Sequence, residues 1–240
     1  EKTNQLVKNL FIDPLTKLSN REKLLIDFEF KKFVAILNID SFKEINDFYG
    51  IEIGDRVLKE IGNILSLEVE LYKLAGDEFA ILDDNMENIT LKVENLMKVI
   101  ENSKIIIDEN ISIEWTMSCG IADNLSQADI ALKYAKQTKQ KIVVFDNQLP
   151  LVKEYENNLK WKNIIKKAIK NDNIVPYIQP LVNSNSKKID KFECLIRLKE
   201  GDRVYSPYFF LEISKKTGQY QELQKIMIKK SFEKFKNLES

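Results

Sequence analysis

The sequence predicts an α/β (α+β) fold in which helices cover both faces of a β-sheet. Residues Phe33–Ile39 are apolar almost throughout, which is typical of a strand that is buried on both faces. Apolar residues recur at helical spacing over residues 125–139, so a helix is expected there. Strands and helices of these kinds alternate along the chain, with one hairpin among them, and this order indicates a layered sandwich.

The other elements of the first part follow from local signals in chain order. Asp13 and Pro14 mark a turn, after which Ser19 or Asn20 can cap a helix. A second turn at residues 75–78 separates two short strands. The predicted helices are residues 21–30, 41–48, 53–67, 89–101 and 125–139. The predicted strands are residues 33–39, 70–74, 79–82, 104–107, 111–121 and 143–146.

The net charge of zero hides two halves of opposite charge. Residues 1–150 hold 18 basic and 26 acidic side chains, and residues 151–240 hold 19 basic and 11 acidic ones, so the halves carry −8 and +8. A shift of this size predicts two units with a border near residues 147–150. Because the chain starts at Glu1 rather than Met, we expect a fragment in which residues 1–10 form a linker helix from an upstream region.

The composition excludes several kinds of chemistry. There is no histidine, so imidazole bases, Ser–His–Asp catalysis and His-ligated zinc are ruled out, and metal chemistry must use carboxylates that favour magnesium. Cys119 and Cys194 are too few for a disulfide framework. We therefore expect a cytoplasmic chain, or the cytoplasmic part of a larger membrane-anchored sensor, without membrane or nucleic-acid contacts of its own.

Four separated blocks occur in a fixed order in the first part. They are residues 13–21 (Asp-Pro-Leu-Thr-Lys-Leu-Ser-Asn-Arg), 38–47 (Asn-Ile-Asp-Ser-Phe-Lys-Glu-Ile-Asn-Asp), 75–79 (Ala-Gly-Asp-Glu-Phe) and 129–136 (Asp-Ile-Ala-Leu-Lys-Tyr-Ala-Lys). Together with the Gly54-Asp55 pair, they resemble the GGDEF family of diguanylate cyclases. The resemblance implies a GGDEF domain over residues 11–148, with an adenylyl-cyclase-like sheet between helices.

The resemblance also implies an activity and a set of site residues. Enzymes of this family join two GTP molecules, one on each subunit of a dimer, into cyclic di-GMP with the help of Mg²⁺ or Mn²⁺. By resemblance, Asp77 is a metal ligand, Asn38 holds a degenerate metal position, and Glu78 lies beside the reacting hydroxyl group. The implied nucleotide-binding residues are Asn46, Asp55, Gly76 and Lys136.

The sequence departs from the family pattern where metal and phosphate are handled. Asn38 replaces the first metal carboxylate, and a neutral amide should weaken two-metal binding. Ala75 replaces the first hairpin glycine, and its methyl group should crowd the phosphates and disfavour a positive φ. Gln140 and Ile51 replace an arginine and a histidine, and residues 66–69 lack the product-inhibition motif. These changes predict an inactive cyclase unit.

Each motif residue also has a purely structural interpretation. Asp40 can be the N-cap of the helix at residues 41–48, and Asp13 can be an ordinary turn residue. Asn46 and Asp55 can be surface caps. Asp77 and Glu78 can form an ordinary acidic turn, and Lys136 can belong to a solvated basic face.

A second resemblance begins after residue 150. Residues 176–182 (Pro-Tyr-Ile-Gln-Pro-Leu-Val) and 192–198 (Phe-Glu-Cys-Leu-Ile-Arg-Leu) resemble the start of an EAL domain, the cyclic di-GMP phosphodiesterase barrel. This implies that Glu193 is a metal ligand and that Gln179 and Arg197 bind cyclic di-GMP. The structural alternative for Glu193 and Arg197 is a cross-strand ion pair.

The second part is too short to close a barrel. The predicted helices are residues 151–170, 207–217 and 220–237, and the predicted strands are residues 174–181 and 189–198. A (β/α) barrel needs eight strands, so residues 151–240 are expected to be the N-terminal portion of an EAL domain that cannot hydrolyse cyclic di-GMP alone. Open strand edges predict pairing with a second copy, in a homodimer, or with the remaining EAL segment.

Three functions are compatible with these motifs. The first is a bacterial cyclic di-GMP signalling protein, in which an inactive GGDEF unit acts as a regulatory GTP-binding or dimerisation module beside a truncated EAL unit. The second is a weak diguanylate cyclase that converts two GTP molecules into cyclic di-GMP. The third is an interaction module without a ligand.

Overall fold

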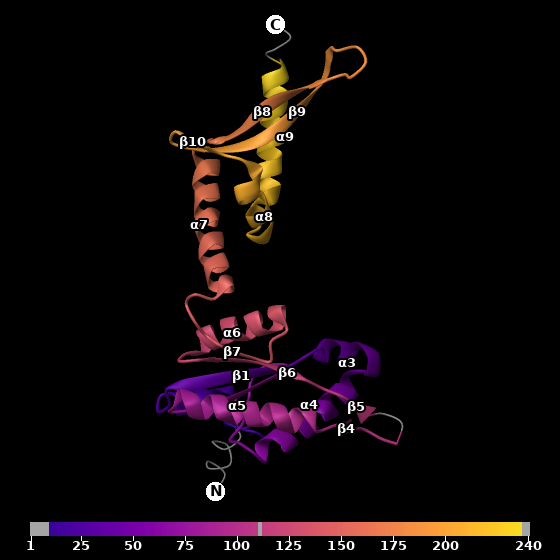
Figure 1. Cartoon of the computed structure of the whole chain (residues 1–240), viewed down its shortest axis with the longest axis vertical. Coiled ribbons are helices and arrows are strands. Elements are labelled where there is room, and N and C mark those ends of the chain that lie inside the picture. Colours follow the sequence, from indigo (N-terminus) through magenta and orange to yellow (C-terminus); the bar gives the residue numbers. More distant parts are fainter. Residues whose placement is uncertain (1–9, 110–111, 237–240) are drawn as a thin grey trace. The chain divides into compact units, whose positions relative to one another are not determined.

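The chain folds into two units, Glu1–Leu151 and Val152–Ser240. The computed structural model describes residues 10–109 and 112–236 (Figure 1). The linker helix expected at residues 1–10 lies outside the described residues, apart from Leu10. Within the described ranges, we find no helix with the length and apolar character that a membrane span requires.

The first unit is built on a mixed five-stranded sheet. Its strands are, in spatial order, β2 (Tyr72–Lys73), β3 (Glu78–Asp83), β1 (Phe33–Ile39), β6 (Met117–Ala122) and β7 (Ile142–Val144). Only β6 and β7 are parallel, and the other neighbours are antiparallel. The central strand β1 is buried along almost its whole length, as its apolar run predicts.

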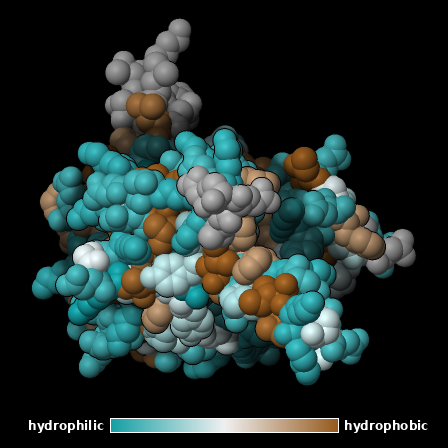
Figure 2. All heavy atoms as spheres, turned by 90° about the horizontal axis from the view of Figure 1, so that it is seen from above, coloured by the Kyte–Doolittle hydropathy of each residue, from teal (hydrophilic) through white to brown (hydrophobic). Residues whose placement is uncertain are grey.

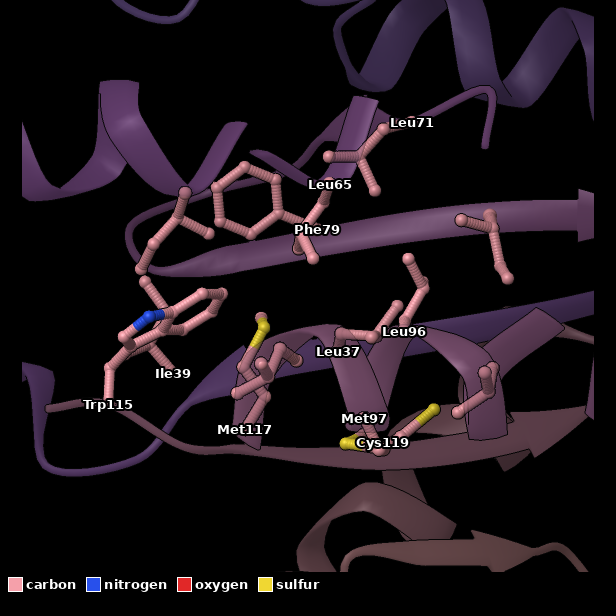
Figure 3. Close-up of a cluster of buried hydrophobic side chains, with 14 of the residues drawn as sticks. Leu37, Ile39, Leu65, Leu71, Phe79, Leu96, Met97, Trp115, Met117 and Cys119 are labelled. Carbon is pink, nitrogen blue, oxygen red and sulfur yellow. The ribbon is translucent and has the colours of Figure 1, made fainter. Parts of the chain in front are cut away.

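Helices cover both faces of this sheet, so the predicted sandwich is confirmed. One face packs against α4 (Ile51–Ser66) and α5 (Met86–Glu101), and the other against α2 (Arg21–Phe28) and α6 (Leu125–Thr138). Figure 3 shows part of the first core, in which Leu37, Phe79 and Met117 from the sheet lie near Leu65 and Leu96 from the helices.

One predicted strand is in fact two. We expected a single strand at residues 111–121, but β5 (Ser112–Ile113) pairs with β4 (Ile105–Ile106), whereas β6 pairs with β1. The chain therefore leaves one sheet and enters another at residues 114–116, which belong to neither strand. An alternating apolar pattern does not reveal such a change of partner.

The predicted turn and cap before α2 are both formed. Oδ1 of Asp13 accepts hydrogen bonds of 2.7 Å from the backbone N–H and from the hydroxyl group of Thr16. The side chain of Asn20 accepts a hydrogen bond of 3.1 Å from the N–H of Lys23, and Asn20 is therefore the N-cap of α2.

A glycine sets how closely α6 approaches the sheet. A Cβ atom at Gly120 of β6 would lie 2.2 Å from the carbonyl oxygen of Ala128 and 2.2 Å from the backbone nitrogen of Leu132. No side chain fits in that space, so glycine allows α6 to lie directly on β6. This packing fixes the position of Lys136 in the last turn of α6.

The second unit is a three-stranded antiparallel sheet with three helices. The strand order is β10 (Arg203–Tyr205), β9 (Ile189–Glu200) and β8 (Ile174–Val182), and the helices are α7 (Pro150–Lys170), α8 (Pro207–Lys216) and α9 (Tyr220–Lys236). The sequence prediction missed β10, which follows a two-residue turn with Gly201 at a φ of 58°. The described residues form an open sheet and no closed barrel.

The second unit has a core of its own and exposes apolar side chains. Trp161, Phe210 and Leu223 are buried in this core. Ile228 and Phe232, one turn apart on α9, are exposed. Figure 2 likewise shows apolar side chains between hydrophilic ones on the surface that it views.

Candidate functional site

Three polar side chains form a row across the first sheet. Asn38 of β1 lies opposite Glu78 of β3 and opposite Ser118 of β6. Residues that lie directly opposite on neighbouring strands share one face of a sheet. Val34 and Ile36, which have the same parity as Asn38, pack against α2 and α6. The polar row Glu78–Asn38–Ser118 therefore continues the α6-covered face, where the apolar residues end.

The amide group of Asn38 connects the β2–β3 hairpin to α6. Asn38 is only 6% exposed, its Nδ2 donates a hydrogen bond of 3.0 Å to Oδ1 of Asp77, and Nζ of Lys136 donates a short hydrogen bond to its Oδ1. An ammonium group can only donate and an ionised carboxylate can only accept, so these partners fix the orientation of the amide. The structure thus brings together three of the predicted site residues.

Asp40 does not cap the following helix, contrary to the sequence interpretation. Its two carboxylate oxygens accept hydrogen bonds of 2.7 Å from the hydroxyl groups of Thr116 and Ser118. The N-cap of α3 (Phe42–Tyr49) is Ser41, which has a φ of 55° and makes no side-chain capping hydrogen bond. The β1–β6 ladder extends to the backbone N–H of Asp40, so its carboxylate reaches the hydroxyl groups of the neighbouring strand.

In the β2–β3 hairpin turn, Gly76 has a positive φ. The N–H of Glu78 donates to the carbonyl oxygen of Ala75 at 3.1 Å, and Gly76 between them has a φ of 58°. Ala75 is exposed and its φ is not positive, so the expected backbone strain at this residue is absent. The predicted nucleotide-binding residue Gly76 therefore has the glycine-specific conformation of the turn.

A buried lysine that the sequence analysis missed supports the hairpin from within. Lys73 is 4% exposed, and its Nζ donates hydrogen bonds to the carbonyl oxygens of Gly76 at 2.6 Å and of Leu74 and Glu78 at 3.3 Å each. Burial lowers the pKa of Lys73, and nearby carboxylates oppose this effect. The sequence signal that could have indicated this role is a lysine within a predicted strand, three residues before the glycine of the turn.

Glu78 is a half-buried carboxylic acid at the edge of a small cavity. Burial raises its pKa, and the negative charges of Asp129 and Asp77 raise it further. Lys136 and Lys73 act in the opposite direction. Glu78 and Asp129 line a cavity of about 250 Å³ between the hairpin and α6.

A second cavity lies on the lysine side of the polar row. It has a volume of about 490 Å³, and Lys136, Lys139 and Lys141 contribute ammonium groups to its lining. Asp40 and Ser118 also line this cavity. Lys141 is paired with Glu101, so Lys136 and Lys139 are the lysines of this lining that favour an anionic ligand such as phosphate.

Two of the predicted nucleotide-binding residues, Asn46 and Asp55, come from a different pair of helices. Asn46 lies on α3 and Asp55 on α4, and both are half-buried. A Cβ atom at Gly54 would lie 1.8 Å from Oδ1 of Asn46, so the glycine allows the amide of Asn46 to lie against the α4 backbone next to Asp55. The close approach of α3 to α4 therefore places the amide of Asn46 beside the helix turn that carries Asp55.

The predicted cyclic di-GMP residues of the second unit share one face of its sheet. Gln179 of β8 lies opposite Glu193 of β9, and Arg197 is four residues further along β9 on the same face. Because Glu193 and Arg197 lie on the same strand, the alternative of a cross-strand ion pair is wrong. The guanidinium group of Arg197 instead lies over the ring of Tyr177, at 5.5 Å from its centroid.

The polar row does not fit a divalent metal ion in the arrangement described. Magnesium binds oxygen ligands, but the Nδ2 group of Asn38 points to Asp77 and the Oδ1 atom is occupied by Lys136. Among the residues that the structure describes, no three Asp, Glu, Cys or His side chains are grouped so that they could hold a metal.

The sandwich with its Asp77–Glu78 hairpin and the polar face of β8–β9 together correspond to a GGDEF domain followed by an EAL segment. The chain belongs to the GGDEF domain family, described as "Diguanylate cyclase, GGDEF domain", whose model matches residues 10–141. Residues 162–240 match the model of the EAL domain.

Curated relatives are similar to most of this chain. The cyclic di-GMP phosphodiesterase PdeB of Shewanella oneidensis is 28% identical over 256 residues, which cover 95% of this chain and 30% of PdeB. The bifunctional diguanylate cyclase/cyclic di-GMP phosphodiesterase MucR of Pseudomonas aeruginosa is 25% identical over 244 residues, which cover 89% of this chain and 35% of MucR. The chain thus spans about a third of the length of these relatives.

Two solved structures show the same fold. The diguanylate cyclase SiaD of Pseudomonas aeruginosa, in complex with its activator SiaC, aligns with a TM-score of 0.54 at 25% identity over 60% of this chain and 65% of SiaD. The S helix–GGDEF–EAL structure of Vibrio cholerae LapD, bound to c-di-GMP, aligns with a TM-score of 0.53 at 19% identity over 100% of this chain and 61% of that chain. The second likeness concerns the fold alone.

Proposed function

We propose that residues 11–148 are a degenerate GGDEF domain that binds GTP for regulation and does not form cyclic di-GMP. In this proposal, residues 151–240 are the N-terminal portion of an EAL domain, and the chain acts in the cytoplasm as part of a longer signalling protein. The observation that carries the proposal is the amide of Asn38, which is held between Asp77 and Lys136.

The hydrogen bonds of Asn38 argue against catalysis. Joining two GTP molecules requires divalent cations that neutralise charge on the phosphates as the bond forms. Asn38 supplies an N–H group to Asp77 where the family has a metal carboxylate, so the row offers less negative charge and fewer oxygen ligands. The resulting site can hold a nucleotide but lacks the means to activate it.

Other contacts favour retained nucleotide binding. Asn46 lies against α4 beside Asp55, an arrangement that suits hydrogen bonds to the edge of a base. The ammonium groups of Lys136 and Lys139 border a cavity large enough for phosphate groups. We further propose that two copies of the chain associate as a homodimer, because in this family each subunit of a dimer binds one of the two GTP molecules.

Thermal unfolding with and without GTP tests this function. A ligand that binds only the folded protein stabilises it, by about 2.7 kcal/mol at a hundredfold excess over the dissociation constant. We expect millimolar GTP to raise the melting temperature of the first unit, and Asn46→Ala to reduce the rise. Asn63→Ala on the exposed side of α4 is the matched control. The absence of any rise at millimolar GTP would reject GTP binding and leave an interaction module.

The second unit is proposed to supply part of a cyclic di-GMP site. Gln179, Glu193 and Arg197 share a face that no described helix covers, because the helices pack on the opposite face through Ile174 and Leu198. We propose that Gln179 and Arg197 contact the dinucleotide and that Glu193 binds a metal ion once the rest of an EAL barrel is present. Cyclic di-GMP should then bind the longer protein more tightly than residues 151–240.

A further inference from the structure

Asn38 stands at the position of a metal-binding carboxylate in the family, and it is hydrogen-bonded to the ammonium group of Lys136. Nζ of Lys136, in the last turn of α6, donates a hydrogen bond to Oδ1 of Asn38. Nδ2 of the same amide donates a second hydrogen bond to Asp77. The order of the charges is therefore ammonium, amide and carboxylate across the end of the sheet. This arrangement keeps a positive charge fixed beside the polar row without any bound ion.

The hydrogen-bond chemistry of Asn38 opposes a metal ion in the same place. To ligate a cation with its oxygen, Asn38 would have to release Lys136, and the ammonium group would remain within a few ångströms of the new positive charge. To bridge a cation with Asp77, it would also have to lose the N–H contact at 3.0 Å. Both changes cost interactions that the amide now makes.

The adjoining cavity suits a ligand with uncompensated negative charge. Lys136 and Lys139 line the cavity of about 490 Å³, while Lys141 is paired with Glu101. Asp40 is the acidic residue of the lining, and both of its carboxylate oxygens accept hydrogen bonds from the hydroxyl groups of Thr116 and Ser118. Free GTP carries more negative charge on its phosphates than the magnesium complex of GTP. Fixed ammonium groups attract the more highly charged form more strongly.

We infer that this site binds nucleoside triphosphate without a divalent metal, and that the ammonium group of Lys136 takes the place of the ion. This inference rests on the proposed function, since it concerns how the proposed GTP site is built. It assigns metal-free GTP as the ligand, and it makes Lys136 the residue that determines the response to magnesium.

Calorimetric titration of the full chain with GTP, in EDTA and in excess Mg²⁺, tests the inference. We expect the affinity in EDTA to equal or exceed the affinity in Mg²⁺. We also expect Lys136→Met to weaken binding in EDTA by about tenfold. Lys59→Met, which removes an exposed lysine from α4, is the matched control and should bind like the unchanged chain. Thermal unfolding of each variant checks that the sandwich is intact.

Asn38→Asp separates the metal requirement from binding itself. A carboxylate at this position adds a charged oxygen ligand next to Asp77, so this variant should bind GTP more tightly in Mg²⁺ than in EDTA. Binding by the unchanged chain that is tighter in Mg²⁺ than in EDTA would overturn the inference and leave the proposed function standing. Binding in neither condition would overturn both.

Discussion

Asn38 shows how much of a site depends on where a single amide points. The sequence predicts that an amide at this position lacks the charge of a carboxylate. It does not predict the partners, because Lys136 is 98 residues away along the chain and meets Asn38 only through the packing of α6 on β6. Lys73 was missed for the same reason, since its burial depends on the hairpin closing over it.

Glu78 should make stability depend on pH in a characteristic direction. Its pKa in the folded state is raised from the ordinary 4.5 by burial and by Asp129, so folding favours its protonated form. Its stabilising contribution is therefore complete below the ordinary pKa and is lost as the pH rises through the raised value. Glu78→Gln should raise the melting temperature at about pH 7, and this gain should vanish in acid.

Glu114 provides the control for this prediction because its pKa is shifted in the opposite direction. A hydrogen bond from Lys104 lowers the pKa of this exposed carboxylate, so its contribution is present above the ordinary value and is lost as the pH falls. Glu114→Gln should therefore lower the melting temperature slightly near neutrality. A fall in the melting temperature of Glu78→Gln at neutral pH would contradict the assignment of Glu78 as a half-buried carboxylate that destabilises the folded state when it is ionised.

Asp40 should contribute to stability through β6 and not through a helix cap. Asp40→Ala removes the acceptor of two hydroxyl groups, and we expect the free energy of unfolding to fall by about 1–3 kcal/mol. In a Ser118→Ala background the same change should cost less, because one of the two hydrogen bonds is already gone. Denaturant titrations of the single and double variants measure this coupling, and equal losses in both backgrounds would refute it.

At the scale of elements, the sequence predicts what periodicity and turn residues determine. The apolar run of β1 and the apolar stripe of α6 are both found where predicted. The predictions failed where the pairing partner determines the strand. β10 has only three residues and pairs with β9, and the strand expected at residues 111–121 divides because its halves pair with different neighbours. The predicted strand at residues 189–198 already placed Glu193 and Arg197 on one strand, and β9 confirms this.

The packing of α6 on β6 should tolerate no side chain at Gly120. A methyl group there would lie 2.2 Å from backbone atoms of α6, which cannot move without displacing the helix. Gly120→Ala should therefore lower the free energy of unfolding by about 1–3 kcal/mol or more, measured by denaturant titration.

Displacement of α6 should also affect the site, because this helix carries Lys136. Gly120→Ala should thus weaken GTP binding together with stability. Ala75→Gly, at an exposed residue of ordinary φ, is the control and should change stability by less than about 1 kcal/mol. A fully stable Gly120→Ala variant would show that the close contact between helix and strand is not required.

At the scale of the whole molecule, the chain is two units with separate cores. The division between Leu151 and Val152 lies next to the border that the change in charge predicts. The buried clusters of the first unit contain no residue of the second, and the cluster around Phe210 contains none of the first. Each unit therefore has its own source of stability.

Core truncations should act on one unit at a time. Phe210→Ala should destabilise the second unit by about 3–5 kcal/mol, and Ile61→Ala should destabilise the first by about 2–5 kcal/mol, since both side chains are fully buried. Calorimetric scans should show that each variant lowers a different unfolding transition. One transition that shifts as a whole in both variants would show that the units unfold together.

The first unit should bind GTP without converting it. The most direct measurement is to incubate the full chain with radiolabelled GTP and Mg²⁺ or Mn²⁺, and then to follow both retained GTP and product by chromatography. We expect retained GTP and no cyclic di-GMP, because Oδ1 of Asn38 accepts a hydrogen bond from Lys136 and its Nδ2 donates one to Asp77. Formation of cyclic di-GMP by the unchanged chain would contradict it.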